Sequence, residues 1–174
     1  LFFALLCSLS SNAQRDKSPI GDKIVELYES GNYEAAFEYS MQEARKGNAY
    51  AQYKTGFLYF YGEGVKKDLS QAYIWLKKSA EHENYFAQTL IAVMYADGLG
   101  IKQDYKEAIK WYKKAAEQND DIAQYDLGEC YYYGKGVTKD FSQAFYWYKK
   151  SAERDNVDAQ RDLGYLYENG EGVS

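Results

Sequence analysis

The sequence has 174 residues, of which 46% are hydrophobic and 18% aromatic, and its formal net charge is −5 at pH 7. This apolar content excludes a disordered chain, and the negative charge disfavours nucleic acids and anionic lipid surfaces as partners. The single proline, Pro19, leaves every later residue with a backbone amide donor, which favours an all-α fold.

The chain begins with a short apolar run, Leu1 to Leu6, followed by small polar residues. Ser11 and Ala13 are small residues at the two positions that a signal peptidase reads, so residues 1–13 are predicted to be part of a signal peptide that is cleaved before Gln14. The run is shorter than the roughly 20 apolar residues that span a bilayer. We therefore expect an exported chain, periplasmic or extracellular (or in the secretory lumen of a eukaryote), without stable membrane insertion after cleavage.

Two alternatives for this segment stay open. Cys7 could carry a lipoprotein anchor, although bulky Leu6 stands where a small residue is expected, or the run could be a buried helix fused to the rest of the fold. Residues 14–21 are polar and are predicted to be a linker. Residues 22–47 have the pattern of a helix pair joined through Gly31 and Asn32, and are predicted to be an atypical capping pair.

From residue 48 onward the sequence repeats with a period of 36 residues. The predicted units are 48–83, 84–119 and 120–155, with a fourth at 156–174 that stops within a repeat, so the protein is expected to continue. Three features recur at this interval and are predicted to be structural, namely a Gly-x-Gly joint, an aspartate and a tryptophan: Gly62, Gly64, Gly98, Gly100, Gly134, Gly136, Asp68, Asp104, Asp140, Trp75, Trp111 and Trp147.

Each unit has the pattern of two helices. The first begins after an Asn or Asp that can cap it and ends at the Gly-x-Gly joint, whose glycine can adopt a left-handed C-cap. Glycines within this helix, such as Gly56 and Gly128, predict close approach of the partner helix. The second helix begins at an Asp that Gln or Glu follows three residues later, an aspartate version of the capping box. Its tryptophan lies between alanines on one predicted packing face.

These motifs, Ala-x-x-x-Leu-Gly-x-x-Tyr, Gly-x-Gly-Val-x-x-Asp and Ala-x-x-Trp-Tyr-x-Lys-Ala-Ala, resemble the Sel1-like repeat of the tetratricopeptide-like superfamily, over residues 48–174. The resemblance implies a right-handed α-solenoid of antiparallel helix pairs, whose first helices line a concave groove. It also implies a scaffold that binds proteins or peptides.

The predicted groove lies on one face of each first helix, namely the face whose residues differ from one repeat to the next. It is rich in tyrosine, which gives large contact area at a small cost in rotamer entropy, so we expect it to take an extended peptide or a glycan strand. The predicted lining residues are Tyr50, Tyr53, Phe57, Tyr61, Phe86, Thr89, Val93, Asp97, Tyr125, Glu129, Tyr132, Tyr133, Arg161 and Tyr165.

No catalytic residue, metal site or cofactor is predicted. The single histidine, His82, has no second histidine to share a metal, and Cys130 recurs as Leu58, Met94 and Leu166 in the other units, which indicates a packing position. Two alternative interpretations would make the protein an enzyme or part of one. Cysteine-rich relatives of this repeat imply an envelope or cell-wall-active protein of the penicillin-binding or β-lactamase-like kind, although this chain lacks their paired cysteines. The chain could also be the targeting arm of a longer enzyme.

Overall fold

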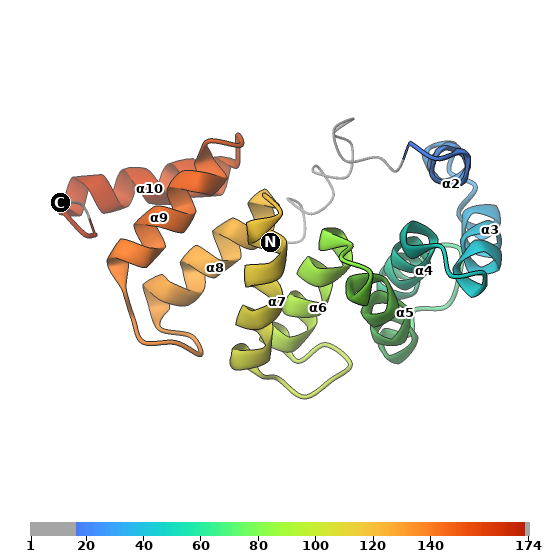
Figure 1. Ribbon diagram of the computed structural model, residues 1–174, viewed down its shortest axis with the longest axis horizontal. Helices are drawn as coiled ribbons and strands as arrows, with labels where there is room; N and C mark the ends of the chain where they lie inside the picture. The colour runs from blue at the N-terminus through green and yellow to red at the C-terminus, as the bar shows by residue number, and fades with distance from the viewer. Residues whose placement is uncertain (1–16, 173–174) are drawn as a thin grey trace. The chain divides into compact units, whose positions relative to one another are not determined.

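The computed structural model describes residues 17–172, and the predicted signal peptide and its cleavage site lie outside them. The described chain is helical, with short connections and no strand, which confirms the all-α prediction (Figure 1). Its helices are α2 (Pro19–Glu29), α3 (Tyr33–Arg45), α4 (Ala49–Tyr61), α5 (Leu69–Glu81), α6 (Tyr85–Asp97), α7 (Tyr105–Glu117), α8 (Asp121–Tyr133), α9 (Phe141–Ala152) and α10 (Val157–Asn169).

The described residues divide into two compact units, with the boundary between Asn84 and Tyr85. In the first, α4 packs against both α3 and α5; in the second, α6 packs against α7, and α8 packs against both α7 and α9. Each first helix therefore contacts its own second helix and, within a unit, the second helix before it. This is the packing expected of stacked helix pairs, in which each repeat buries the apolar face of its neighbour.

The first helix begins earlier than the sequence indicates. α2 starts at Pro19 instead of Asp22, so the carboxyl end of the predicted linker 14–21 is helical. Ser18 explains the difference, because its hydroxyl accepts the amide of Gly21 at 3.1 Å as an N-cap, and proline suits the first turn of a helix. The helix pair predicted for the cap is otherwise present, with Gly31 at φ 78° in its joint.

The predicted caps of the first helices are present in α4, α8 and α10. Asn48 Oδ1 accepts the Ala51 amide at 2.8 Å to begin α4, and Asp120 Oδ1 accepts the Ala123 amide at 2.7 Å to begin α8. Asn156 caps α10 in the same way. Each side chain satisfies an amide that has no partner within the first turn of its helix.

The aspartates of the second helices also act as caps, but the expected capping box is only half formed. Asp68 Oδ1 accepts the amide of Gln71 at 2.9 Å. The amide of Asp68, which a capping box would give to the Gln71 side chain, instead donates to the carbonyl of Tyr59 at 3.0 Å. Asp104 and Asp140 repeat this arrangement. The bond ties the end of each joint to the helix before it.

The glycines of the joint have the conformation that the sequence predicts. Gly62 and Gly134 end α4 and α8 with φ of 78° and 69°, and the Gly62 amide donates to the carbonyl of Leu58 at 2.8 Å. Only glycine reaches this left-handed region without steric cost. The first glycine of the joint is therefore a C-cap, as expected.

Glycines inside the first helices permit the close approach predicted for them. A Cβ on Gly56 would lie 2.6 Å from Leu76 Cγ, and one on Gly128 would lie 2.5 Å from the Tyr148 ring. The partner helix thus occupies the space that a side chain would need. Gly164 differs, because none of the described atoms lies within 4 Å of its ideal Cβ.

A recurring glutamine has a structural role that we did not predict. Gln52 and Gln124, which are two periods of 36 residues apart, donate to the carbonyls of Ala44 and Ala116 at 3.3 and 3.0 Å, and both side chains are buried. Gln160 makes the same bond to Ala152. Each bond satisfies a carbonyl near the end of the previous helix. The 36-residue recurrence of the glutamine was the available signal.

The recurring tryptophans are only half-buried, although the sequence suggested a buried face. Trp111 packs against the core at one edge, and the ammonium of Lys114 lies 4.5 Å from its ring centroid. Lys78 lies over Trp75 in the same way, at 4.4 Å. The next position along the helix is the deeply buried one, with Tyr112 only 3% exposed. The tryptophan therefore shields the core edge beneath a lysine.

This placement predicts the relative cost of two substitutions in α7. Trp111→Ala should destabilise the chain by roughly 1–3 kcal/mol, because part of the ring is already in water, whereas Tyr112→Ala should cost about 3–5 kcal/mol. Urea unfolding followed by circular dichroism measures both. A larger loss for Trp111→Ala than for Tyr112→Ala would contradict the assignment of the packing face.

The remaining structural predictions concern Cys130 and the membrane. Cys130 is 4% exposed, and burial raises the pKa of its thiol to about 12, which fits the inert packing position that its 36-residue equivalents indicate. Among residues 17–172, no helix combines the length and the apolar character that crossing a membrane requires.

Candidate functional site: a tyrosine-lined hollow

The carboxyl-terminal unit contains a hollow of about 420 Å³ between α8 and α10, which we call the tyrosine hollow. Six of the residues predicted to line a groove lie in it together. Two further residues, Tyr148 of α9 and Asp162 of α10, complete the lining. The full set is Tyr125, Glu129, Tyr132, Tyr133, Tyr148, Arg161, Asp162 and Tyr165.

Helical spacing explains why these residues meet. Tyr125, Glu129 and Tyr132 recur at intervals of four and three residues, so they share one face of α8. Arg161 and Tyr165 are four residues apart on α10. The Tyr125 hydroxyl donates to Asp162 Oδ2 at 2.9 Å and thereby joins the two helices.

Two lining residues were missed because their equivalents in other units have other roles. Tyr148 occupies the packing position of Leu76 and Tyr112, and it is 1% exposed, yet its hydroxyl reaches Glu129. Asp162 occupies the position of Lys54 and Asp126. In another unit leucine occupies each of these positions, Leu76 for Tyr148 and Leu90 for Asp162. A polar side chain at a position that can hold leucine was the only sequence signal for these two residues.

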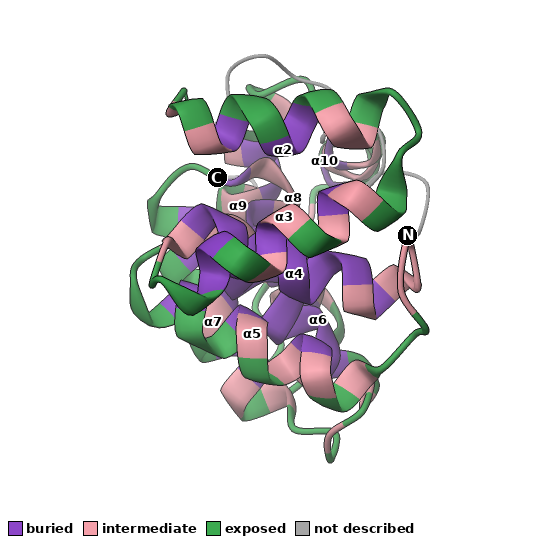
Figure 2. Cartoon of the chain, turned by 90° about the vertical axis from the view of Figure 1, so that its right-hand side faces the viewer, coloured by how far each residue is buried: buried purple, intermediate pink, exposed green. Residues whose placement is uncertain are grey.

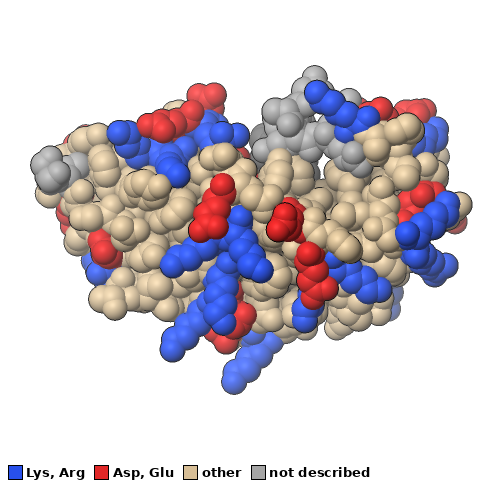
Figure 3. Space-filling view, viewed as in Figure 1, with Lys and Arg blue, Asp and Glu red and all other residues tan. Residues whose placement is uncertain are grey.

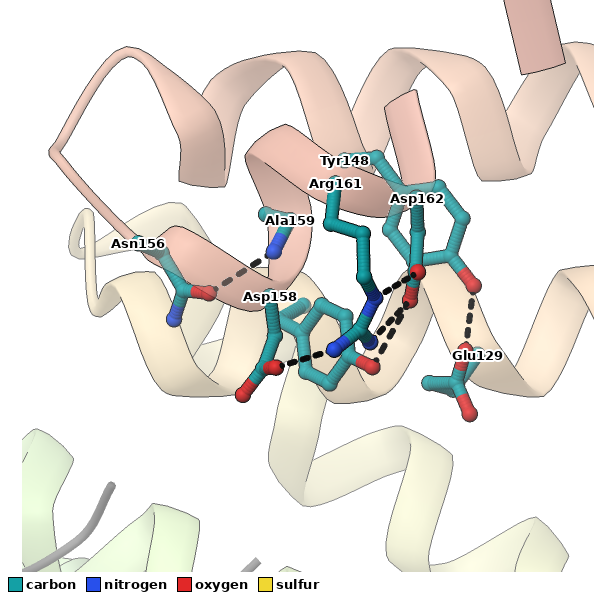
Figure 4. Close-up of polar contacts among 8 residues, drawn as sticks. Glu129, Tyr148, Asn156, Asp158, Ala159, Arg161 and Asp162 are labelled. Atoms are coloured by element: carbon teal, nitrogen blue, oxygen red, sulfur yellow. Dashed lines mark hydrogen bonds and ion pairs between the residues drawn. The ribbon is translucent and has the colours of Figure 1, made fainter. Parts of the chain in front are cut away.

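An ion-pair network occupies one side of the hollow (Figure 4). The guanidinium of Arg161 lies between two carboxylates, with Nη1 2.8 Å from Asp158 Oδ1 and Nε 2.8 Å from Asp162 Oδ1. Asp162 also accepts the Tyr125 hydroxyl, so both of its oxygens are engaged. This network fixes the side chains of α10 that face the hollow.

Aromatic rings form the other sides. The rings of Tyr125 and Tyr148 are stacked with centroids 5.6 Å apart, and Tyr132 contacts Tyr165 edge to face at 6.5 Å. Tyr133 and Tyr165 are 59% and 51% exposed, so a ligand can reach both. Rings held in this way offer contact area without further ordering.

The electrostatics of the hollow keep its hydroxyls neutral. Burial, together with the neighbouring carboxylates Glu129 and Asp162, raises the pKa of Tyr125 and of Tyr148. Burial also raises the pKa of the Glu129 carboxyl, and nearby Asp162 adds to this effect, while the hydrogen bond from Tyr148 opposes it. The phenols therefore act as hydrogen-bond donors to the carboxylates that line the hollow.

The predicted groove residues of α4 lie elsewhere and are mostly inaccessible. Tyr50, Tyr53 and Phe57 are 9%, 2% and 0% exposed, and ten of the 13 residues of α4 are buried, as its purple ribbon shows (Figure 2). Their rings pack on one another, with centroids of Tyr53 and Phe57 6.0 Å apart. Tyr61 is half-buried beside Phe57. These side chains stabilise the fold, and a partner cannot reach the three buried rings without displacing other groups.

The predicted residues of α6 are divided in the same way. Thr89 and Val93 are buried, and the Thr89 hydroxyl donates to the Tyr85 carbonyl at 3.0 Å. Phe86 is half-buried and Asp97 is exposed. Buried Thr89 and Val93 therefore lack the surface that a groove residue needs, whereas partner binding by the exposed residues stays a prediction.

Residues 17–172 contain no group of three His, Cys, Asp or Glu side chains arranged to hold a metal ion. His82 is exposed at the end of α5, beside a second hollow of about 400 Å³ that Arg45, Trp75 and Lys78 also line. On the face shown in Figure 3, acidic and basic side chains lie next to one another. The tyrosine hollow is lined by six of the predicted groove residues, whereas none of them lines the second hollow.

The sequence model of the Sel1 repeat matches residues 49–84, 86–120, 121–156 and 157–174. Among solved structures, a Sel1 repeat protein from Oxalobacter formigenes is 35% identical with a TM-score of 0.84, and the match covers 91% of this chain and 63% of that one. The c5321 protein, a protective antigen present in uropathogenic Escherichia coli strains that displays an SLR fold, is 43% identical with a TM-score of 0.77, over 79% of this chain and 30% of that one.

A third structure, cysteine-rich protein B of Helicobacter pylori, is 20% identical with a TM-score of 0.58, over 84% of this chain and 98% of that one, and shows likeness of fold alone. No curated protein matches the sequence significantly. The chain spans less than two thirds of the first two solved relatives.

Proposed function

Because this chain belongs to the Sel1 repeat family, whose repeat matches four successive segments, we propose that it is a non-catalytic scaffold that binds a peptide segment of a partner protein in the tyrosine hollow. The observation that carries the proposal is the convergence of exposed tyrosine rings and fixed polar groups from α8 and α10 on one cavity. Concave sites with a few placed polar groups are the usual form of a binding site.

The hollow suits side chains of an extended peptide. Its volume of about 420 Å³ holds a few side chains. Tyr133 and Tyr165 stand at its accessible edge, and tyrosine is enriched among the residues that contribute most to binding energy. The Arg161 network is formed within the chain itself, so binding would not have to order it.

The proposal is tested by selecting binders from a phage-displayed library of random peptides about 12 residues long. We expect wild-type protein to enrich peptides, and the double substitution Tyr133→Ala with Tyr165→Ala to lower the affinity of the synthesised peptides by about tenfold or more. Both tyrosines are more than half exposed, so circular dichroism melts should stay near wild type.

Tyr146→Ala is the matched control, because Tyr146 is also exposed, at 45%, but does not line the hollow. Its affinity for the selected peptides should equal that of wild type. Failure to enrich any peptide, or equal binding by the double variant, would contradict peptide binding in the hollow. Binding of a glycan strand in place of peptides would be such a failure.

Export is a separate proposal that rests on the sequence alone. The apolar run Leu1 to Leu6 and the small residues Ser11 and Ala13 support a signal peptide, and a secreted or periplasmic chain is the compartment we propose for the scaffold.

A further inference from the structure

Glu129 makes no ion pair in the tyrosine hollow. Its carboxylate accepts the hydroxyl of Tyr148, and it forms no ion pair with any residue of the described chain, 17–172. The nearest guanidinium of the hollow, that of Arg161, is directed to Asp158 and Asp162 instead (Figure 4). The half-buried carboxylate of Glu129 is therefore held at the wall of a cavity without an ion pair, although Lys135 and Arg161 are near enough to lower its pKa.

The charges around the hollow do not balance. Glu129 and Asp162 line it, and Asp158 and Glu171 adjoin it, whereas Arg161 is the one cation among the lining residues that the structure describes. Two further cations lie at its edge, with the ammonium groups of Lys135 and Lys139 5.1 and 5.4 Å from the ring centroids of Tyr133 and Tyr132. Four carboxylates thus stand against three cations. The local sum is negative, which favours a cation in the space between them and disfavours an anion.

The tyrosines strengthen this preference. Tyr132 lies one helical turn from Glu129 on α8, and its ring meets that of Tyr165 of α10 edge to face. The faces of aromatic rings carry partial negative charge, so an ammonium or guanidinium between such rings gains a cation–π interaction. Rings and a carboxylate thus converge on the same part of the cavity.

The chain itself shows such an arrangement at an equivalent position. Lys54 stands three periods of 36 residues before Asp162, on the corresponding face of the first helix of its repeat. Its ammonium lies 5.1, 5.5 and 5.2 Å from the ring centroids of Tyr28, Tyr53 and Phe57. In the amino-terminal unit, then, this helix face holds a lysine among aromatic rings, whereas in the carboxyl-terminal unit the lysine is replaced by an aspartate and the space is open.

We propose that the peptide bound in the tyrosine hollow presents a lysine or arginine side chain whose cation pairs with Glu129 and lies against the rings of Tyr132 and Tyr165. This inference rests on the proposed function and specifies its ligand. A neutral side chain in the same place would remove water from Glu129 without replacing it by a partner, and an acidic side chain would add like charge. The hollow therefore selects among peptides by charge.

Glu129→Gln is the informative substitution. Glutamine has nearly the same shape and its carbonyl still accepts the Tyr148 hydroxyl, so the variant should fold as wild type does by circular dichroism. Glu117→Gln is the control: it removes the same charge from an exposed residue of α7 that is not among those lining the hollow.

The experiment repeats the selection from the random peptide library with wild type, Glu129→Gln and Glu117→Gln. Peptides selected by wild type and by Glu117→Gln should carry Lys or Arg at one shared position, and those selected by Glu129→Gln should not. For one synthesised peptide, replacing that basic residue by norleucine should weaken binding to wild type about tenfold or more, and should change binding to Glu129→Gln little.

The outcomes separate this inference from the proposed function. Peptides that lose affinity for the Tyr133→Ala, Tyr165→Ala variant but show no basic position would overturn the inference and leave peptide binding intact. Equal selection of basic peptides by Glu129→Gln would overturn it as well. Absence of any enriched peptide, or binding unaffected by the tyrosine substitutions, would contradict both.

Discussion

Replacing Gly64 by alanine is expected to destabilise the amino-terminal unit by about 2–5 kcal/mol, through two effects that act together. Gly64 has φ of 67°, where a side chain strains the backbone. A Cβ there would also lie 2.1 Å from the carbonyl oxygen of Tyr33, at the start of α3. That neighbour is backbone and cannot rotate away, so the joint would have to move off the helix on which it rests.

Gly31→Ala separates the two effects. Gly31 has φ of 78° but nothing within 4 Å of its ideal Cβ, so alanine there carries the conformational strain alone, about 1–2 kcal/mol. Urea unfolding followed by circular dichroism should show a clearly lower midpoint for Gly64→Ala than for Gly31→Ala. Equal midpoints would mean that the contact between the joint and α3 contributes nothing.

The same contact recurs in the carboxyl-terminal unit, where a Cβ on Gly136 would lie 2.6 Å from Tyr105 Cβ and one on Gly172 would lie 2.2 Å from the Phe141 carbonyl oxygen. The two glycines of the joint thus differ in role. The first ends a helix, and the second allows the joint to rest on the start of the preceding second helix.

The second large effect is expected from Asp126, a buried carboxyl in the core of the carboxyl-terminal unit. It is 7% exposed, the Tyr112 hydroxyl is its hydrogen-bond partner, and its Oδ2 has no partner. Burial raises the pKa of the Asp126 carboxyl from 3.8 to about 7. The folded chain therefore holds this proton at pH values where the unfolded chain has released it.

The sign of the pH dependence follows from this difference. As pH rises above about 4 the unfolded chain loses the proton while the folded chain keeps it until about pH 7, so the stability of the folded state falls across this window and then levels. Asp120, whose pKa burial also raises to about 7, contributes in the same direction. Wild-type protein should accordingly unfold at a lower urea concentration at pH 8 than at pH 5.

Asp126→Asn should remove much of that difference, because asparagine stays neutral at both pH values and can still bond Tyr112. At pH 8 the variant should be more stable than wild type by on the order of 2 kcal/mol, with little change at pH 5. Glu168→Gln, an exposed carboxyl of α10, is the control and should follow wild type. A variant that keeps the full wild-type slope between pH 5 and pH 8 would contradict the raised pKa.

The repeat period, the helices and their caps could be predicted because they depend on groups close together in the sequence. The Asp68 carboxylate accepts an amide three residues away, and Gly62 ends its own helix. The capping box was only half right, since the amide of Asp68 finds a partner, the Tyr59 carbonyl, across the joint. A local sequence pattern predicts which groups can form a hydrogen bond, but not which of two available acceptors the Asp68 amide bonds.

The tyrosine hollow could not be distinguished from the other predicted groove positions by sequence alone. Tyr53 and Tyr125 are two periods apart, are the same residue type and were predicted to do the same thing. Tyr53 is 2% exposed within a cluster of rings, whereas half-buried Tyr125 bonds Asp162 and lines a cavity. The difference lies in the residues that other helices bring beside them.

By itself the sequence determined that this protein is a stack of helix pairs, because a 36-residue pattern of caps and glycine joints leaves the backbone few alternatives. The tertiary structure alone decided which tyrosines form a site, because accessibility and charge balance at one helix depend on side chains contributed by its neighbours. It placed the buried packing position at Tyr112 beside Trp111, and it left Glu129 at the wall of an open hollow without an ion pair.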